Sequence, residues 1–580
     1  MRISMLFLML LFLPVMLTGQ IIPQDRTVNW TTAGTYALFD DPAAQLNVMD
    51  FGATGDGVTD DAAAIQSAID AIGAQGGVVY LPGGEFLIQS PLTLPSRAVL
   101  RGVDSLSTHL LMDFEGEPLH GIHIAGAVLS SYYLLLSGYE KGSNSVVVAN
   151  GEAFSDGTFA EIVQENGEWD TEPAPWAEQA AGQIVKVEAV NGDTLVLRHP
   201  LRMTYSDALE PKIRAIDPVK EVAVEQLRLE RMDEPSEGAG SNIYINLATN
   251  IRIRDIESDK SVGSHLAIYR STQVRLEGSY IHHAFTYDGS GTRGYGVTLH
   301  THSGECLIEN NVFEHLRHAM MVKTGANGNV FGYNYSIDPH RSETISDYSG
   351  DISLHGHYAY ANLFEGNIAQ NIFIDHYWGP SGPYNTFFRN RAELYGFVIT
   401  ASDNATDQQN VAGLEVTNTN FLYGMYTLNG SDHFEYGNYV TGDIVPVETD
   451  SLPDTSYYLS GLPAFWTQGL PWPSIGVPLE AGAYDIPAKQ RHLGLNTMAG
   501  TRHRSALAIA PNPARSQIIF SGWGEGPVTI STFDLQGNKV LVQKESNKRS
   551  LAVSHLESGA YIITFQDEKR FAAKKVFIVR

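Results

Sequence analysis

Cysteine is almost absent from this chain, since Cys306 is the single cysteine in 580 residues. An intramolecular disulfide is therefore excluded, and the fold must be held by its core, by metal or by the stacking of repeats. Cys306 is followed by Leu307 and Ile308, which form a short apolar strand pattern. Free cysteine is among the most often buried residues, so we expect Cys306 to be a core residue and not a nucleophile.

Positive charge is also scarce, with 38 Lys and Arg against 65 Asp and Glu and a net charge of −27. A nucleic-acid-binding protein carries a basic face, so this balance argues against nucleic acid as a partner. The acidic excess is typical of an extracellular protein that its charge keeps dispersed. It still allows a locally basic cleft for a polyanionic ligand.

Long apolar runs are missing beyond the N-terminus, where Arg2 precedes the apolar run Met5–Leu17. This pattern predicts a signal peptide over residues 1–19, with cleavage near Gln20. The run is too short to span a bilayer comfortably, and no other stretch qualifies as a membrane span. We therefore expect an exported protein without a membrane span.

The sequence contains repeats. Short strand patterns begin at Ile251, Val274, Cys306, Val330, Leu363 and Phe387, at spacings of 23, 32, 24, 33 and 24 residues. The longer spacings contain polar, Gly-rich extra residues, 286–294 and 338–350, which are typical of loops inserted into a coil. Asn310, Asn334 and Asn367 share one register and predict a ladder of asparagines at a tight bend. A period near 23 residues favours an all-β fold, the three-sided parallel β-helix, over an irregular β-sandwich.

The first coil of such a solenoid needs a cap. An amphipathic helix is predicted over Asp60–Ile72, with Ile65, Ala68, Ile69 and Ile72 as its apolar stripe. The stretch Asn47–Asp61, followed by Gly76–Gly84 and Leu100–Gly102, resembles the entrance of the pectate-lyase-like superfamily, which includes rhamnogalacturonases, epimerase-like enzymes and phage tailspikes. The resemblance implies a right-handed parallel β-helix. It does not imply an activity, because that entrance caps the helix and carries no chemistry.

Residues from about 130 to 214 break the coil rhythm. Gln183–Val187 and Thr194–Leu197 flank the turn Asn191–Asp193, so they predict an antiparallel pair within a small β insertion. The insertion either borders a substrate groove or is decoration.

The last 75 residues, Ala506–Arg580, contain short strand patterns and turns. They resemble the C-terminal sorting domain of type IX secretion cargo in Bacteroidota. The resemblance implies a β-sandwich module, the type IX machinery as partner, and a secreted or cell-surface location. The β-helix domain is then expected over 20–505. An immunoglobulin-like carbohydrate-binding sandwich is the alternative for the module.

Polar residues line up at the ends of successive strand patterns. Each of them follows a buried apolar residue, so their side chains should point outward in one column: Asn246, Tyr269, His300, Lys323 and His355. The neighbouring turns add further polar candidates: His302, Arg317, His318, His357, Asp375 and His376. Such a column on a long face suits an extended polymer whose successive sugars contact successive coils.

The side chains of the column predict a polysaccharide lyase that cleaves a uronate glycan by β-elimination. Lys323, His300 or His355 would remove the C5 proton, and Tyr269 or Arg317 would assist the leaving oxygen. Six residues are predicted to bind substrate: His302, His318, His357, Asn246, Asp375 and His376. The column is similar to β-helix lyases that use Lys and Arg around a bound calcium, but the sequence has no matching calcium motif. A Ca²⁺ site is therefore inferred only from two carboxylates, Asp351 and Glu365.

Two other functions stay open. A glycoside hydrolase needs two carboxylates, about 5 Å or roughly 6.5–9.5 Å apart. Asp347, Asp351, Glu365 and Asp375 are candidates, but the paired aspartate motifs of polygalacturonases do not appear in this region. A non-catalytic glycan-binding or adhesion protein would use the same fold. We expect a monomer.

Overall fold

The computed structural model describes most of the chain. The described residues are 20–34, 44–235, 238–288, 292–401, 406–494, 508–510, 514–521, 527–533, 539–546, 550–566 and 571–578. The signal peptide predicted over 1–19 lies outside them. Contacts divide the chain into two compact units, Met1–Lys489 and Gln490–Arg580. Within the described ranges, no helix is long and apolar enough to cross a membrane.

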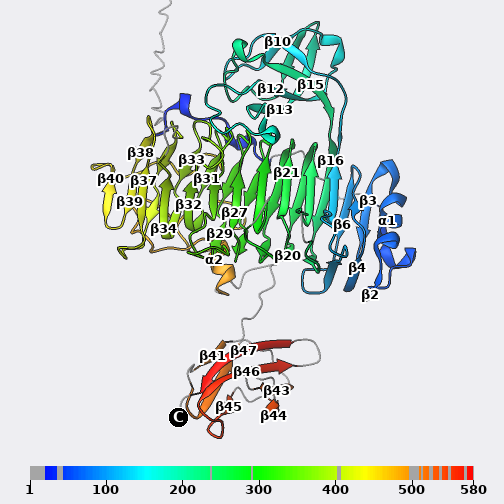
Figure 1. Cartoon of the computed structure of the whole chain (residues 1–580), viewed down its shortest axis with the longest axis vertical. Coiled ribbons are helices and arrows are strands. Elements are labelled where there is room, and N and C mark those ends of the chain that lie inside the picture. The colour runs from blue at the N-terminus through cyan, green and yellow to red at the C-terminus, as the bar shows by residue number, and fades with distance from the viewer. Residues whose placement is uncertain are drawn as a thin grey trace, which may run out of the picture. The chain divides into compact units, whose positions relative to one another are not determined.

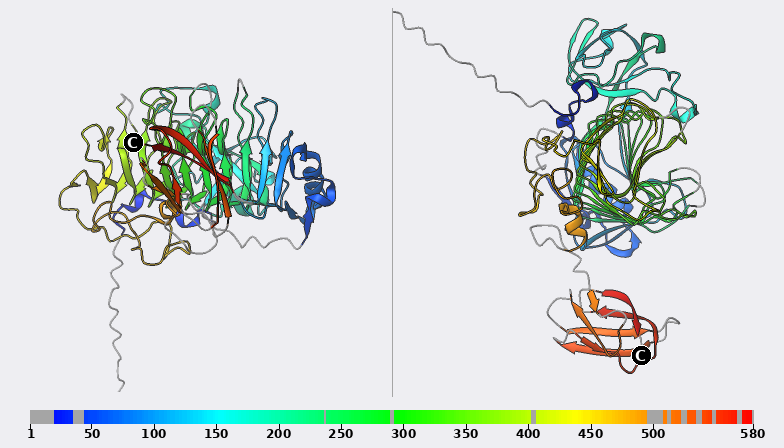
Figure 2. Two further views of the ribbon diagram at one scale, coloured as in Figure 1. Left: turned by 90° about the horizontal axis from the view of Figure 1, so that it is seen from below. Right: turned by 90° about the vertical axis from the view of Figure 1, so that its left-hand side faces the viewer.

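The first unit is a right-handed parallel β-helix, whose coils stack along one axis and enclose a common interior (Figures 1 and 2). Its three faces are built from successive strands of each coil. The first face is one twelve-stranded parallel sheet made of β1 (Gln45–Asn47), β3 (Gly77–Tyr80), β6 (Ala98–Arg101), β16 (Val219–Glu225), β19 (Ala248–Arg254), β22 (Thr272–Glu277), β25 (Leu307–Glu309), β28 (Val330–Gly332), β31 (Leu363–Glu365), β33 (Thr386–Phe388), β35 (Asn410–Ala412) and β38 (Phe434–Tyr436).

The second face follows the first within each coil. It contains β2 (Asp56–Asp60), β4 (Gly84–Ile88), β7 (Thr108–Met112), β17 (Arg228–Arg231), β20 (Glu257–Asp259), β23 (Tyr280–His282), β26 (Val312–Glu314), β29 (Tyr335–Ile337), β32 (Ile368–Ile374), β34 (Arg391–Ile399), β36 (Glu415–Val416), β39 (Asn438–Val440) and the antiparallel β40 (Asp443–Val445).

The third face completes the coil. It contains β5 (Leu92–Thr93), β8 (Ile122–Ala125), β18 (Ile243–Asn246), β21 (Ser264–Tyr269), β24 (Tyr295–His300), β27 (His318–Val322), β30 (Ile352–Leu354), the C-terminal parts of β32 and β34, and β37 (Met425–Leu428). The long strands β32 and β34 run through both the second and the third face.

One apolar core runs along the solenoid, because alternate side chains of each strand point inward. Phenylalanines stack within it from coil to coil, with ring centroids 4.9 Å apart for Phe331 and Phe364 and 5.1 Å apart for Phe364 and Phe387. Cys306 is fully buried in the same core, as predicted. Burial raises the pKa of its thiol to about 12, which makes it a poor nucleophile.

The predicted asparagine ladder is present, but its first residue is Asn311 and not Asn310. Asn311 donates to Asn334 at 3.0 Å, and Asn334 donates to Asn367 at 3.0 Å. Asn310 is not a rung, because the sheet pairs Leu307 with Val330 and so places Asn311 opposite Asn334. A second ladder, missed in the sequence, joins Asn329, Asn362 and Asn385 at the preceding bend.

Helix α1 (Ala62–Ala71) closes the N-terminal end of the solenoid, as predicted (Figure 1). Its apolar stripe, which includes Ile65 and Ile69, is buried in the core of the β-helix. A chain end that would expose core and unpaired strand is therefore covered.

The insertion is an antiparallel sheet with a core of its own. Its strands are β9 (Ala127–Val128), β10 (Tyr133–Ser137), β11 (Ser145–Val148), β12 (Phe159–Val163), β13 (Gly182–Asn191), β14 (Thr194–Leu197) and β15 (Lys212–Asp217). β13 and β14 form the antiparallel pair expected around the turn at Gly192. Figure 1 shows the insertion standing on the side of the β-helix near β21 and β16.

Segments near both ends of the first unit cover the outer side of its first sheet. Trp30 and Trp466 join Val330 and Leu363 in one apolar cluster there. Arg389 holds the tail by donating to the backbone carbonyls of Leu452, Asp454 and Ile475. The strands of this sheet from β25 to β35 are therefore covered. The short helix α2 (Pro487–His492) follows.

The second unit contains two antiparallel sheets in its described residues. One has β41 (Ala508–Ala510), β42 (Gln517–Ser521) and β45 (Ser550–Ala552), and the other has β43 (Pro527–Phe533), β44 (Lys539–Ser546), β46 (Gly559–Gln566) and β47 (Phe571–Ile578). Ile518, Ile530, Leu551 and Ile563 are among the side chains of its core.

Candidate functional site

The third face carries a row of outward polar side chains in consecutive coils. The strand register pairs Asn246 with Tyr269 and Tyr269 with His300. In the following strands the register pairs Leu299 with Val322, Val322 with Leu354 and Leu354 with Ile374. These four residues directly precede His300, Lys323, His355 and Asp375 in the chain. The row therefore continues through Lys323, His355 and Asp375, with about 4.8 Å between neighbours. We call these six residues the polar row: Asn246, Tyr269, His300, Lys323, His355 and Asp375. The predicted column is thus present, and the structure adds Asp375 to it.

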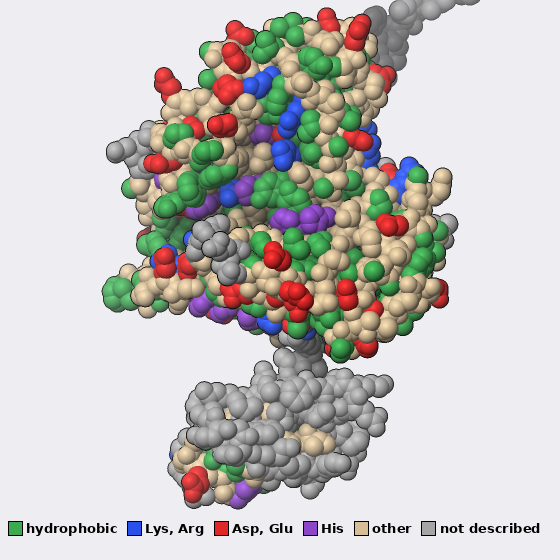
Figure 3. Space-filling model, turned by 45° about the vertical axis from the view of Figure 1, so that its right-hand side comes forward, with side chains coloured by type: hydrophobic (Ala, Val, Ile, Leu, Met, Phe, Trp, Pro, Cys, Tyr) green, Lys and Arg blue, Asp and Glu red, His purple; other side chains and the backbone are tan. Residues whose placement is uncertain are grey.

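The insertion covers one side of this face and supplies aromatic side chains to it. Figure 3 shows a hollow between the insertion above and the β-helix below, with histidine and basic side chains inside it. Trp176 of the insertion has its ring 5.0 Å from Lys323 Nζ and 5.2 Å from the ring of Trp378. Trp176 stays 45% exposed, so it presents a free aromatic surface beside the cation. Trp176 could not be placed here from sequence, since more than 140 residues separate it from Lys323 along the chain.

His355 and Asp375 form a hydrogen-bonded pair at one end of the polar row. Nδ1 of His355 lies 2.7 Å from Oδ2 of Asp375, and Oδ1 of Asp375 accepts from the backbone N–H of Tyr377 at 3.1 Å. Burial alone would raise the pKa of Asp375, but the charge and hydrogen bond of His355 lower it. The carboxylate therefore fixes the ring of His355 and its tautomer, with Nε2 directed away from Asp375. The ring of His318 lies 5.9 Å from that of His355.

Burial changes the ionisation of the rest of the row. It lowers the pKa of Lys323 to about 8. It lowers the pKa of His300 well below its ordinary value, and the nearby Lys323 adds to this, so His300 is neutral. Nε2 of His300 is buried without a hydrogen-bond partner among the described residues, and its ring stacks on Tyr269 at 4.4 Å. Burial raises the pKa of Tyr269 to about 12, so its phenol keeps its proton.

Two residues predicted to help at the row also have partners outside it. Arg317 Nε lies 3.8 Å from Asp288, and its guanidinium lies 5.8 Å from the ring of Tyr295. His318 is buried and its Nδ1 lies 2.8 Å from the carbonyl oxygen of Gly350, and burial lowers its pKa to about 3. A catalytic role for Arg317 stays a prediction. His318 is a neutral neighbour of His355.

Two predicted substrate-binding histidines, His302 and His357, are buried and used inside the protein, which corrects the prediction for them. The half-buried His376 stays a prediction. Both ring nitrogens of His302 are engaged at 2.8 Å, by Glu161 Oε1 and by the carbonyl oxygen of Gln179. His357 is fully buried and its Nε2 lies 3.1 Å from the carbonyl oxygen of Glu172. These two histidines fasten the insertion to the β-helix. His376 lies between Thr400 Oγ1 at 2.7 Å and the backbone N–H of Thr406 at 2.8 Å.

The two predicted calcium ligands do not form a site together. Asp351 lies before β30 of the third face and Glu365 lies in β31 of the first, and both are buried. Asp351 accepts from Ser336 Oγ at 2.5 Å and from the backbone N–H of Asn371 at 2.8 Å. Glu365 accepts from the backbone N–H of Tyr457 at 2.8 Å. Burial raises the pKa of Asp351 to about 6 and that of Glu365 to about 7, which disfavours the ionised form that calcium requires.

Two segments of the chain match known sequence families. Residues 45–112 match the family described as rhamnogalacturonase A/epimerase, pectate lyase-like. This pectate lyase-like segment contains the entrance and α1 but no residue of the polar row, so it explains the fold and not the site. Residues 508–579 match the secretion system C-terminal sorting domain. The sorting domain marks the chain for export to the cell surface or beyond.

The chain is similar to several curated proteins over short stretches. It is 67% identical over 43 residues to mannuronan C5-epimerase AlgE5 of Azotobacter vinelandii, which is 7% of this chain and 4% of the epimerase. It is 34% identical over 131 residues to alginate lyase 7 of the same organism, which is 22% of this chain and 13% of the lyase. It is 42% identical over 88 residues to plasmin and fibronectin-binding protein A of Streptococcus pneumoniae, which is 15% of this chain and 11% of that protein.

Solved structures with similar folds cover more of the chain at lower identity. The tailspike gp49 of Pseudomonas phage LKA1 is 15% identical, with a TM-score of 0.47 over 68% of this chain and 63% of the tailspike. The A-module of mannuronan C-5 epimerase AlgE6 of A. vinelandii is 18% identical, with a TM-score of 0.32 over 68% of this chain and 98% of the module.

Proposed function

We propose that this protein is a secreted polysaccharide lyase that cleaves a uronate-containing glycan by β-elimination along the polar row. The observation that carries the proposal is the oriented His355–Asp375 pair two strands from a neutral His300, with Lys323 between them. The similarity of short segments to proteins named as a mannuronan C5-epimerase and an alginate lyase supports a polysaccharide substrate.

Each residue is assigned a step that its environment favours. Lys323, when charged, binds the carboxylate of the uronate, which makes the C5 proton more acidic. Nε2 of His355 takes that proton while Asp375 holds the ring in place. The electron pair of the C5–H bond forms the C4–C5 double bond, and the C4–O bond breaks. The exposed Tyr377, whose ring is stacked 6.4 Å from that of His355, is assigned the proton for the leaving oxygen.

Tyr269 receives a different role from the one predicted for it. It lies three strands from His355, roughly 14 Å at the spacing of parallel strands, which is too far to serve the same sugar. Together with Trp176, it offers an aromatic surface for neighbouring sugar rings.

The hydrolase alternative has less support. Of its four candidate carboxylates, Asp351 and Glu365 are buried and hydrogen-bonded inside the protein. Asp347 accepts from the Tyr395 hydroxyl at 3.1 Å. Asp375, held by His355, is the one carboxylate of the polar row, so a second catalytic carboxylate of the row is lacking.

The test is an assay on a panel of uronate polymers and neutral glycans, following the ultraviolet absorbance of the unsaturated product. We expect the absorbance to rise with a uronate polymer, and Asp375→Asn to lower kcat by about 100-fold while the thermal transition is kept. His109→Gln, on the second face and partly exposed, is the matched control and should keep full activity. An absorbance that rises on none of the uronate polymers would exclude the lyase, and new reducing ends without absorbance would indicate a hydrolase.

A further inference from the structure

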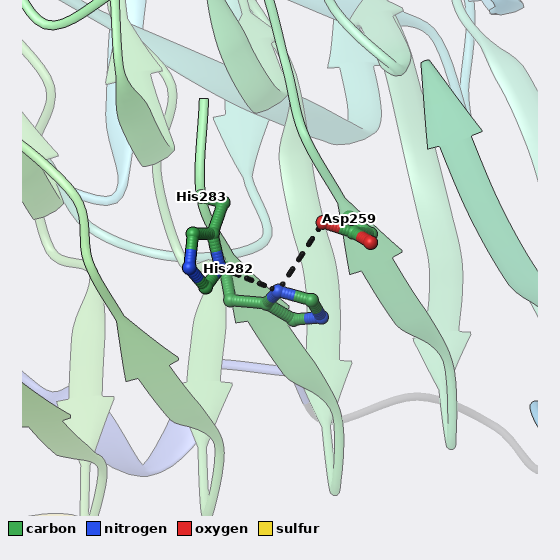
Figure 4. Close-up of side chains that lie close together, drawn as sticks. All are labelled: Asp259, His282 and His283. Carbon is green, nitrogen blue, oxygen red and sulfur yellow. Dashed lines mark hydrogen bonds and ion pairs between the residues drawn. The ribbon is translucent and has the colours of Figure 1, made fainter. Parts of the chain in front are cut away.

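A second histidine cluster lies near the turn that precedes strands β21 and β24 of the polar row. Asp259 ends β20 and His282 ends β23, and His283 follows at the turn that leads to the third face. β21 and β24 begin after this turn, whereas Tyr269 and His300 stand at the ends of these two strands. The cluster is therefore separate from the polar row. Figure 4 shows the three side chains converging from two neighbouring coils.

The potential ligand atoms have the spacing of a metal site. Nδ1 of His282 lies 2.9 Å from Nδ1 of His283 and 3.3 Å from Oδ1 of Asp259, and one ligand atom from each of the three residues lies within 4.8 Å of the others. Ligand atoms on a tetrahedral zinc ion, each about 2.0–2.1 Å from the metal, lie roughly 3.3 Å apart. Small adjustments of the side chains would bring the three atoms onto one ion.

Neighbouring residues hold the three ligands in these orientations. Arg228 donates to Oδ2 of Asp259 at 2.6 Å, which leaves Oδ1 directed at His282. The other ring nitrogen of His282, Nε2, lies 3.3 Å from Oε1 of Glu257. A carboxylate on the far nitrogen of a histidine is the usual partner of a metal-binding imidazole, because it fixes the tautomer and raises the basicity of the ligand.

The local backbone explains how two consecutive residues contribute to one site. Side chains i and i+1 of a strand point to opposite sides. His283, however, has a left-handed φ of 58° and its ring stacks on His315 at 5.0 Å. His315 is held in turn by Asp338, 2.7 Å from its Nδ1.

We propose that Asp259, His282 and His283 bind one divalent transition-metal ion of the zinc type. Two imidazole nitrogens with one carboxylate select zinc, cobalt or nickel over calcium and magnesium, which prefer oxygen ligands. His283 is exposed, so the fourth position opens to solvent and takes water. The ion links two successive coils at the corner between the second and third faces.

The rival interpretation is a hydrogen-bonded network without a metal, in which His282 contacts Glu257, Asp259 and His283. Both interpretations explain the distances, but only the metal site predicts that a divalent ion binds. The experiment uses the untagged full-length protein after treatment with EDTA, titrated with Zn²⁺ by calorimetry and with Co²⁺ by visible absorption. We expect one equivalent to bind in the wild-type protein and to raise the thermal transition.

Variants decide whether the binding belongs to this cluster. His283→Ala, at an exposed position, and Asp259→Asn should each weaken metal binding by about tenfold or more and remove the effect on the thermal transition. His340→Ala is the matched control, because its ring stacks on His315 at 4.3 Å in the same histidine group without belonging to the ligand set. Absence of saturable binding in the wild type, or equal binding in His283→Ala, would overturn the proposal. Activity on glycans does not enter this test, so it is independent of the lyase proposal.

Discussion

At the scale of single residues, the polar row is unusual because its groups titrate differently from the same residues in water. Tyr269 keeps its proton, His300 is neutral, and the ammonium of Lys323 is easier to deprotonate. Burial is the largest cause of all three shifts.

The pKa of Lys323 predicts how the activity depends on pH. Since burial lowers this pKa from 10.5 to about 8, the charge is present below pH 8 and is lost as the pH rises above it. If Lys323 binds the uronate carboxylate, kcat/KM should fall above about pH 8. Lys323→Arg keeps its charge at any such pH. The kcat/KM of this variant should stay high to higher pH than that of the wild type. An unchanged fall of kcat/KM above about pH 8 would show that Lys323 is not the group that titrates.

The sequence predicted this row well, because a strand alternates its side chains strictly. A residue that follows a buried apolar position must point outward, and parallel strands in register then align Asn246 to His355. The same reasoning failed for His302 and His357. They lie in turns, where direction is not set by alternation, and the insertion that binds them comes from residues far away in the sequence.

At the scale of elements, the asparagine ladders hold the bends of the coil in register. Asn311 donates to the carbonyl oxygen of Leu276 at 3.1 Å and accepts from the backbone N–H of Ser279 at 2.9 Å. These groups are buried, so each would stay unsatisfied without the amide. The ladder thus replaces, for this fold, part of what disulfides supply in other exported proteins.

Substitution of Asn311, which belongs to the ladder, should lower the free energy of unfolding more than substitution of its neighbour Asn310. We expect Asn311→Ala to lower the free energy of unfolding by about 3 kcal/mol, because it leaves buried backbone groups without partners. Asn310→Gly should cost less than about 1 kcal/mol, because Asn310 has a left-handed φ of 53° that glycine adopts readily. Urea denaturation measures both. Equal losses would mean that the ladder does not run through Asn311.

The insertion is held to the β-helix by a buried ionic group. Glu161 is 1% exposed and contacts both His302 and Arg214. Burial opposes its charge, but the hydrogen bonds and charges of these partners lower its pKa to about 2. Its contribution to stability is therefore present above its ordinary pKa of 4.5 and is lost as the pH falls toward 2. The contacts of Glu161 with His302 and Arg214 therefore contribute to stability at neutral pH.

At the scale of the whole molecule, one unit carries the polar row and the other carries the sorting domain. The match of residues 508–579 to the sorting domain places the export function in the second unit. The two units have separate cores, which allows one to be removed without exposing the core of the other.

Deletion of residues 508–580 should therefore stop delivery and leave the β-helix folded. In a host with the type IX machinery, we expect the truncated protein to stay in the periplasm, while the full chain reaches the surface or the medium. Cell fractionation with immunoblotting measures this, and the circular dichroism of the purified truncated protein is the folding control. Delivery of the truncated protein at the normal level would contradict the sorting role.

The sequence by itself determined the architecture, because a solenoid is built from local repeats. The 23-residue period, the cap over Ala62–Ala71 and the alternation of the strands each involve residues close in the chain or one coil apart. Tertiary structure alone decided which polar residues come together and which are used inside the protein. Asp259 lies near His283 of the next coil. Trp176 of the insertion contacts Lys323, and His302 is hydrogen-bonded to Glu161. These last two contacts join the β-helix to the insertion, which lies outside the coil repeat. The periodic pattern of the sequence therefore could not predict them.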